Sequence, residues 1–451
     1  MTKSHRLRLL AAAAPAVLAA GAVFASASSA LAATPTAQPD SQALFSTEGG
    51  VTPQFLANAR TIPHFTFNFT DPTNGVTYPI TMVGADPRSN TSTTVHTVII
   101  PLKMNFVAGN QDTSALNDLG WVGFRATPLN HSFDGSSKVA ATLNSPAFAD
   151  SNYPSDLGGD TAQLGDAFMR AQFNKIGSSY HVKLVNDVTF PTQTLDVPAN
   201  QGLAYVRPVP AWRVAHGLQA TPDATGVANV SWFSAQVQNL MKSLKVDPTT
   251  LPIFLTDNVL LYIGEGNYLN CCILGYHGSG SEMPNSHGTG SINGQGANPV
   301  QTYLYAAYTT PGTYSGFLTD YTGTRTAPRP TRGLSDIHAL SHEVSEWLDD
   351  PFTNNAVQPW KVASAPQYGC TRLLEVGDPV VGLWFGLNGN SDVNAYGQWH
   401  PEDEVFAQWF GRGGIEPVLG SSWDGRFTFD GPRTTGLGGN LTAFLTWAHN
   451  C

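Results

Sequence analysis

Residues 336–351 read DIHALSHEVSEWLDDP, and this stretch has the pattern of one short amphipathic helix. Apolar residues recur along it at helical spacing: Leu340, Val344, Trp347 and Leu348. Ser335 or Asp336 can cap the N-terminus of the helix. Asp350-Pro351 should end it near Asp349, because the residue before a proline disfavours the helical conformation. The sequence therefore predicts a helix with one buried apolar side.

The polar side of this helix carries His342, Glu343 and Glu346, in a chain with only nine glutamates among 451 residues. Residues four apart lie on one helix face, so His342 and Glu346 can bind one divalent ion through a ring nitrogen and a carboxylate oxygen. Glu343 lies about 100° around the helix, where it could take a proton from a water molecule on that ion. The pattern predicts His342 and Glu346 as metal ligands, Glu343 as catalytic base and Zn²⁺ as the ion.

The position of His338 allows a second choice of metal ligands. It lies four residues before His342, so His338 and His342 could bind the ion together, with Glu346 as the third ligand. The alternative that we favour keeps His342 and Glu346 as ligands and gives His338 a supporting role behind them.

A catalytic zinc ion generally has three protein ligands and one open position. The third ligand is expected in residues 373–379, LLEVGDP. Glu375 is the first choice as ligand, with Asp378 orienting a ligand from behind, and these two roles could be exchanged. His277 and His400 are alternative ligands.

The rest of the chain predicts an α+β fold with a mixed sheet. Strands are expected at residues 65–69, 94–102, 180–186, 195–198, 258–263 and 302–308, and helices at 159–175 and 231–244. Residues 273–298, rich in Gly, Ser and Asn, are expected to form a long loop that carries His277. Glu402, Asp403 and Glu404 are expected in the acidic first turn of another helix.

Two lobes are expected. Residues 61–352 would form a β-rich N-terminal lobe that ends in the helix of residues 336–351, and residues 353–451 would form a C-terminal lobe.

The N-terminus has the pattern of a secretory signal peptide in residues 1–32, with three basic residues, an apolar run and an Ala-Leu-Ala site. Residues 33–60 are polar and predict a flexible arm or short propeptide. Removing the signal would change the formal net charge from −10 to −13, because it holds three basic and no acidic residues. We therefore expect a secreted protein that binds no nucleic acid and has no stable membrane association.

The chain has four cysteines: Cys271, Cys272, Cys370 and Cys451. An even number in an exported protein favours two disulfide bonds. Because neighbouring cysteines rarely bond to each other, we expect Cys271 and Cys272 each to bond to one of Cys370 and Cys451. Buried free thiols are the alternative.

Residues Ser341–Pro351 (SHEVSEWLDDP) resemble the His-Glu-x-x-Glu…Asp-Pro segment of a family of secreted bacterial proteins and of the plant Exordium, or phosphate-induced, proteins. Two other stretches are similar to patterns elsewhere in those chains: Glu375-Val376-Gly377-Asp378, and Cys272 with Gly275-Tyr276-His277. The resemblance implies an extracellular protein.

Through His342, Glu343 and Glu346 the chain also resembles the zincin metallopeptidases, although those more often have His-Glu-x-x-His. This resemblance implies a zincin-like fold with an active-site helix and a C-terminal second lobe. The expected function is a secreted zinc metallopeptidase that acts on protein or peptide substrates. The alternative is a non-enzymatic, Exordium-like extracellular binding or signalling protein with a structural metal or none. The sequence leaves the oligomeric state open.

Overall fold

The computed structural model describes residues 53–111, 113, 127–206, 224–264, 266, 268, 271–280, 299–310, 336–361, 370–381, 383–387, 399–431 and 451. All of them belong to one compact unit, Asp40–Cys451. The predicted signal peptide and residues 33–52 of the predicted arm lie outside the described residues. The remainder of that arm contains a short helix, α1 (Pro53–Leu56), whose Leu56 is buried.

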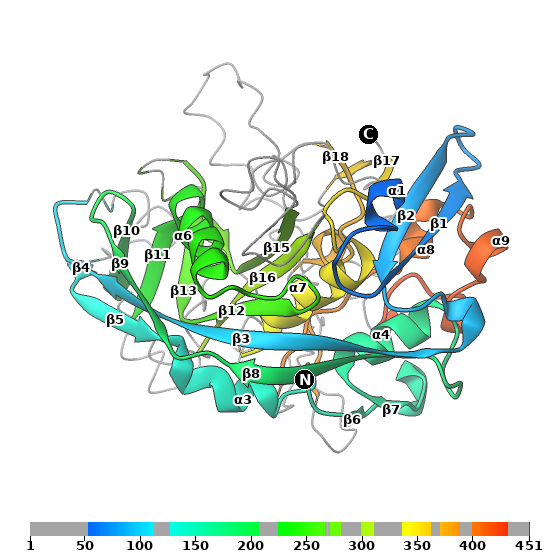
Figure 1. The fold of residues 1–451 in the computed structure, drawn as a ribbon, viewed down its shortest axis with the longest axis horizontal. Helices are drawn as coiled ribbons and strands as arrows, with labels where there is room; N and C mark the ends of the chain where they lie inside the picture. The colour runs from blue at the N-terminus through cyan, green and yellow to red at the C-terminus, as the bar shows by residue number, and fades with distance from the viewer. Residues whose placement is uncertain are drawn as a thin grey trace, which may run out of the picture. The chain divides into compact units, whose positions relative to one another are not determined.

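The largest sheet has seven strands and is mixed, which confirms the predicted α+β class with a mixed sheet (Figure 1). Its strands are β15 (Gly275–Gly280), β16 (Gln301–Tyr308), β12 (Leu251–Asp257), β3 (Ser92–Phe106), β5 (His131–Asp134), β8 (His181–Thr189) and β9 (Gln193–Val197). The first five pair in that order, and β8 and β9 also pair with β3. The neighbours are parallel except β3 with β5 and β15 with β16.

A five-stranded sheet covers another part of the chain, in the order β14 (Cys271–Ile273), β13 (Val259–Tyr262), β11 (Thr225–Asn229), β10 (Gly202–Val206) and β4 (Thr127–Leu129). The helix α6 (Val230–Ser243) follows β11 directly and packs on this sheet. It begins where the Asn229 side chain accepts a hydrogen bond from the backbone N–H of Trp232 at 3.0 Å.

The remaining elements are short. The strands pair in twos: β1 (His64–Thr70) with β2 (Thr77–Val83), β6 (Ser151–Asn152) with β7 (Thr161–Ala162), and β17 (Ala356–Lys361) with β18 (Cys370–Leu373). The short α-helices are α3 (Val139–Leu143), α8 (Ala407–Gly411) and α9 (Glu416–Leu419). Single 3₁₀ turns lie at η2 (Pro87–Ser89), η3 (Gly135–Lys138), η4 (Ser155–Leu157), η7 (Asp378–Val380) and η8 (Trp423–Gly425).

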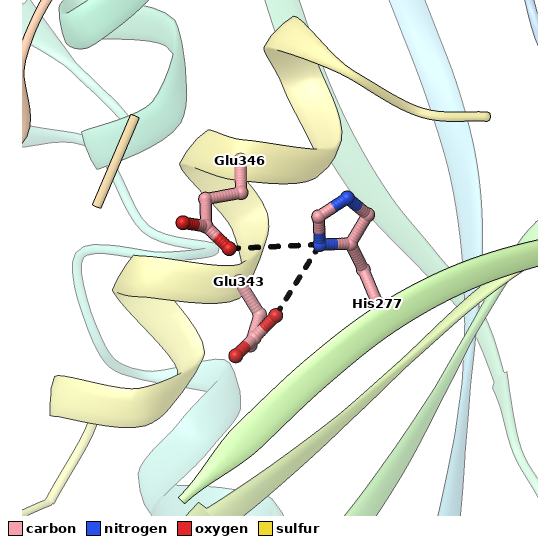
Figure 2. Close-up of side chains that lie close together, drawn as sticks. All are labelled: His277, Glu343 and Glu346. Carbon is pink, nitrogen blue, oxygen red and sulfur yellow. Dashed lines mark hydrogen bonds and ion pairs between the residues drawn. The ribbon is translucent and has the colours of Figure 1, made fainter. Parts of the chain in front are cut away.

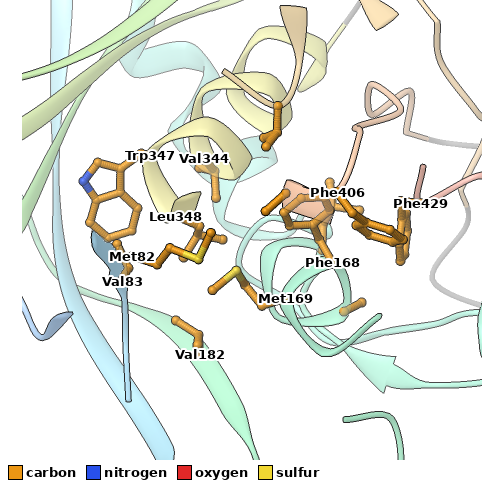
Figure 3. Packing of buried hydrophobic residues seen from close by; sticks show 14 of the residues in the cluster. Met82, Val83, Phe168, Met169, Val182, Val344, Trp347, Leu348, Phe406 and Phe429 are labelled. Atoms are coloured by element: carbon orange, nitrogen blue, oxygen red, sulfur yellow. The ribbon is translucent and has the colours of Figure 1, made fainter. Parts of the chain in front are cut away.

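Most of residues 336–351 form the helix α7 (His338–Asp349), as predicted. Its apolar side is buried against α4 (Leu164–Gln172), β2 and β16. Figure 3 shows Val344, Trp347 and Leu348 packed with Met82 and Met169 in the larger hydrophobic cluster. Trp347 is fully buried, and burying an aromatic side chain of this kind contributes about 2–3 kcal/mol. Burial of this apolar side therefore stabilises the position of α7 in the fold.

The N-terminus of α7 differs from the expectation. The helix begins at His338, and its cap residue, Ile337, makes no side-chain capping bond. Asp336 instead has a φ of 48° and accepts hydrogen bonds from the backbone N–H groups of Ile337 and His400. Asp336 therefore connects the start of α7 to the C-terminal part of the chain. The helix α7 ends at Asp349, as predicted.

Residues 275–280 correct a second expectation, because they form β15 and not a loop. β15 is antiparallel to β16, with His277 opposite Leu304. Successive strand residues face opposite sides. Tyr276 packs on the aromatic rings of Phe233 and Tyr305, and His277 faces α7. Residues 281–298 of the expected loop lie outside the described residues.

The expected disulfide pairing is wrong. Cys370 is bonded to Cys451, so neither can bond to Cys271 or Cys272. The bond ties the first residue of β18 to a residue 81 positions away in the sequence. The side chains of Cys271 and Cys272 lie outside the described part of the structure.

The proposed division near residue 352 stays a prediction. One hydrophobic cluster contains residues from both sides of it, including Val344 and Phe406. Among the described helices, none combines the length and the apolar character needed to cross a membrane.

Candidate metal centre

The polar residues of α7 are buried rather than solvated. Glu343 is 3% exposed and Glu346 is 5% exposed. An ionised carboxylate is stable in such a place only if it is paired or bound to a cation. The described ion pairs of Glu343 and Glu346 go to histidines, His277 and His342.

One group of donor atoms combines His342, Glu346 and Asp378, whose donor atoms all lie within 4.8 Å of one another. His342 Nε2 is 3.2 Å from Glu346 Oε1 and 3.9 Å from Asp378 Oδ1. The Asp378 side chain is 31% exposed and the His342 side chain 12% exposed, so this group reaches solvent on one side. A nitrogen and two carboxylate oxygens are a donor set that Zn²⁺ accepts.

The segment after β18 lies directly over α7 at this point. The backbone N–H groups of Gly377 and Asp378 donate to Glu346 Oε1 at 3.2 and 3.3 Å. A Cβ atom on Gly377 would collide with the imidazole ring of His342. Glycine at residue 377 therefore allows the backbone to approach the helix closely enough to place Asp378 beside His342.

A second group combines His277 with Glu343 and Glu346. Figure 2 shows both glutamates pointing from α7 toward the His277 ring on β15. His277 Nδ1 is 3.4 Å from Glu343 Oε2 and 3.7 Å from Glu346 Oε2. His277 Nε2 lies 3.1 Å from the backbone oxygen of Asp350. Glu346 therefore belongs to both groups, with a different oxygen in each.

Glu402 supports the site from behind and was missed by the sequence reasoning. Its Oε2 atom lies 3.0 Å from His342 Nδ1 and 2.9 Å from His338 Nε2. Its backbone N–H donates to Ser341 Oγ at 2.9 Å. A carboxylate on Nδ1 fixes the orientation of the ring, so that Nε2 would be the nitrogen available to a metal ion. The expectation that Glu402 lies in the first turn of a helix is wrong, because Glu402 forms an isolated β-bridge with Trp384 and α8 begins only at Ala407.

The other predicted residues are placed as follows. His338 contacts Glu402 and makes no described contact with Glu346. Glu375, the first choice as third ligand, has its Oε2 atom 3.8 Å from His277 Nε2, so the structure brings it to His277 and brings Asp378 to His342. His400 Nδ1 is 2.6 Å from Asp336 Oδ2, at the start of α7.

Opposing charges set the pKa values of the paired groups. Burial alone would lower the pKa of His342, but the carboxylates of Glu346 and Glu402 raise it well above its ordinary value. Burial opposes ionisation of Glu402, yet His338 and His342 lower its pKa to about 2. Without a metal ion, the His342 ring and the Glu402 carboxyl are therefore ionised as a pair at neutral pH, and an ion bound at Nε2 would displace the proton of that nitrogen.

The other buried carboxyl groups, those of Glu375, Asp378 and Glu404, are not fully neutralised by nearby cationic side chains. Burial and then the Glu346 charge raise the pKa of Asp378 to about 8 and that of Glu375 well above its ordinary value. Burial also raises the pKa of Glu404 well above its ordinary value, and both of its carboxyl oxygens are buried without a hydrogen-bond partner among the described residues. Such groups hold protons at neutral pH unless a metal ion neutralises them instead.

The sequence signal that could have revealed this centre is the concentration of its few glutamates in one part of the chain. Five of the nine glutamates in the chain lie here: Glu343, Glu346, Glu375, Glu402 and Glu404. Comparison with known proteins finds no matching family model, no matching curated protein and no matching solved structure.

Proposed function

We propose that this protein is a secreted metal-dependent hydrolase, specifically a zinc metallopeptidase with a zincin-like active-site helix. The observation that carries the proposal is the His342, Glu346 and Asp378 group, which puts one nitrogen and two oxygen donors within 4.8 Å and is open to solvent on one side. A catalytic zinc site needs three such ligands and one accessible position.

The residues of the chain have separate tasks in this proposal. His342, Glu346 and Asp378 would hold the ion, and Glu402 would keep the His342 ring oriented. A Zn²⁺ ion would polarise a water molecule and lower its pKa toward 7. Glu343, next to His342 on α7 and not needed to hold this ion, would accept the proton.

Glu343→Gln tests the base. We expect the variant to keep about one equivalent of Zn²⁺ after purification and to lose on the order of 10²–10⁴-fold in turnover of an unfolded protein or mixed-peptide substrate. His342→Ala should lose the ion itself. Glu416→Gln on α9 is the matched control, since it replaces a glutamate outside the centre. Full turnover by Glu343→Gln would remove the peptidase proposal.

The deep burial of Glu343 favours a second candidate, a non-enzymatic extracellular protein with a structural metal ion. It makes a different prediction from the first. Chelation would lower the melting temperature, and no peptide would be cleaved with Zn²⁺, Co²⁺ or Mn²⁺ bound.

Secretion is part of the proposal and rests on the sequence of residues 1–32. Sequencing the N-terminus of the protein from the culture medium tests it. The expected first residue is Ala33, and intracellular protein that still begins at Met1 would contradict it.

A further inference from the structure

The two ring nitrogens of His277 have different partners. Nε2 lies 3.1 Å from the backbone oxygen of Asp350, which can only accept a hydrogen bond, so Nε2 carries the proton. In the neutral ring the lone pair is then on Nδ1, which faces Glu343 and Glu346. A histidine held this way by a backbone carbonyl is prepared to bind a metal ion through its other nitrogen.

Glu346 offers one oxygen to each histidine. Oε1 faces His342 Nε2 at 3.2 Å and accepts the N–H groups of Gly377 and Asp378, whereas Oε2 faces His277 Nδ1 at 3.7 Å. A carboxylate with its oxygens divided in this way can bridge two ions. Such ions lie about 3.5–4 Å apart in known two-metal sites.

The second group is fixed and short of positive charge. A Cβ atom on Gly275 would lie 2.5 Å from Glu343 Cγ, so β15 holds the Glu343 side chain against His277. Two carboxylates face one imidazole there, and all three residues are no more than 5% exposed. Glu375 Oε2, also buried and without a hydrogen-bond partner among the described residues, lies 3.8 Å from His277 Nε2. A divalent cation would offset this negative charge.

We propose that His277, Glu343 and Glu346 form a second divalent-cation site, which shares Glu346 with the first and inhibits the hydrolase when it is filled. Filling it makes Glu343 a ligand, so Glu343 no longer accepts a proton. The one-ion protein is active and the two-ion protein is inactive. The inhibition rests on the proposed function, and the binding of a second ion does not.

Metal stoichiometry tests the binding. Metal-free protein titrated with Zn²⁺ and freed of excess ion should approach about two equivalents at saturation, the first bound more tightly. His277→Gln should bind about one. His96→Gln is the matched control, because His96 also faces a carboxylate, Asp187, but is exposed on β3, and it should bind as many ions as the unchanged protein. Saturation of the unchanged protein at one equivalent, or two equivalents in His277→Gln, overturns the second site.

A measurement on the unchanged protein covers the case in which His277→Gln fails to fold. With Co²⁺ as the probe, the paramagnetic resonance signal should grow up to the first equivalent and weaken as the second binds, because a shared carboxylate couples the two spins. A signal that doubles shows two independent ions and overturns the bridge through Glu346.

Turnover against Zn²⁺ concentration tests the inhibition. Activity should peak near one equivalent and fall on the order of 10²–10⁴-fold when the second ion binds, the loss expected when a general base is removed. His277→Gln should lose this fall. If no peptide is cleaved at any Zn²⁺ level, the proposed function fails while the stoichiometry still decides the second site. If cleavage persists with two equivalents bound, the inhibition is wrong.

Discussion

The Oε2 atom of Glu402 lies 3.0 Å from Nδ1 of His342, although 60 residues separate the two in the sequence. The same oxygen is 2.9 Å from His338 Nε2. Glu402 thus holds the ring that presents Nε2 to Glu346 and Asp378. Two of the predicted histidines, His338 and His342, owe their orientation to one residue from the C-terminal part of the chain.

Glu402→Gln should weaken Zn²⁺ binding by about 10–100-fold, the usual effect of losing a carboxylate behind a metal-bound histidine. The amide of glutamine can keep a hydrogen bond to one of the two histidines. It has no negative charge with which to stabilise both rings. Competition with a coloured chelator measures the affinity, and Glu416→Gln is the control. An unchanged affinity would show that His342 does not need this support.

Gly377→Ala should displace His342 or the 375–378 segment, because the new Cβ atom would overlap the His342 ring. We expect a loss of about 1–3 kcal/mol in the free energy of unfolding, typical of overpacking, together with weaker Zn²⁺ binding. Urea unfolding with and without Zn²⁺ separates the two effects. Binding and stability equal to those of the unchanged protein would contradict the close approach.

Asp349→Asn should stabilise the protein at neutral pH. Burial raises the pKa of Asp349 well above its ordinary value, and Oδ2 has no hydrogen-bond partner among the described residues. Because the folded pKa exceeds the unfolded one, Asp349 favours folding below about pH 4 and this contribution is lost as pH rises through the folded pKa. Asparagine keeps the acceptor for Gln172 and removes the charge.

Melting temperatures between pH 4 and 9, at fixed free Zn²⁺, measure this effect. The gain expected at neutral pH is on the order of 1–3 kcal/mol. Asp166→Asn is the contrasting control: its carboxylate pairs with His181 Nδ1 at 2.7 Å, so the substitution should destabilise. A loss of stability in Asp349→Asn would show that the charged form is the favoured one.

Breaking the bond between Cys370 and Cys451 should cost about 2–4 kcal/mol, because it closes a long loop. Cys370→Ser and treatment of the unchanged protein with a thiol should lower the melting temperature by similar amounts. In the Cys370→Ser variant this bond is already absent, so the thiol should lower the melting temperature little further. Peptide mapping without reduction identifies the partner directly. A Cys370 peptide linked to Cys271 or Cys272 would contradict the structure.

The helix α7 could be predicted because its signals are local: an apolar stripe, an aspartate before a proline, and a histidine and glutamate one turn apart. The strands with alternating residues, such as β1, were predictable for the same reason. β15 was not, since Gly275, Gly278 and Gly280 favour a loop when they are considered alone. Hydrogen bonds to β16 make this segment a strand, and Gly275 leaves room for Glu343.

The partners of the helix residues could not be predicted, because each comes from a distant segment. Nothing near Glu402 shows that it would face His342. The choice between Glu375 and Asp378 depended on which way the backbone turns at Gly377, and the structure brings Asp378 to His342. The sequence did show that glutamate is rare, but the scarcity alone did not show that Glu402 and Glu404 lie beside Glu343 and Glu346.

The alternation along β15 ties the chemistry of the centre to the register of the sheet. Tyr276 lies among aromatic rings and His277 faces α7 because the strand pairs with β16 in one particular alignment. A slip of one residue would turn a phenol toward the two glutamates and force an imidazole into the aromatic cluster. A strand paired one residue out of register would thus give a chain of nearly native shape that lacks the proposed second cation site.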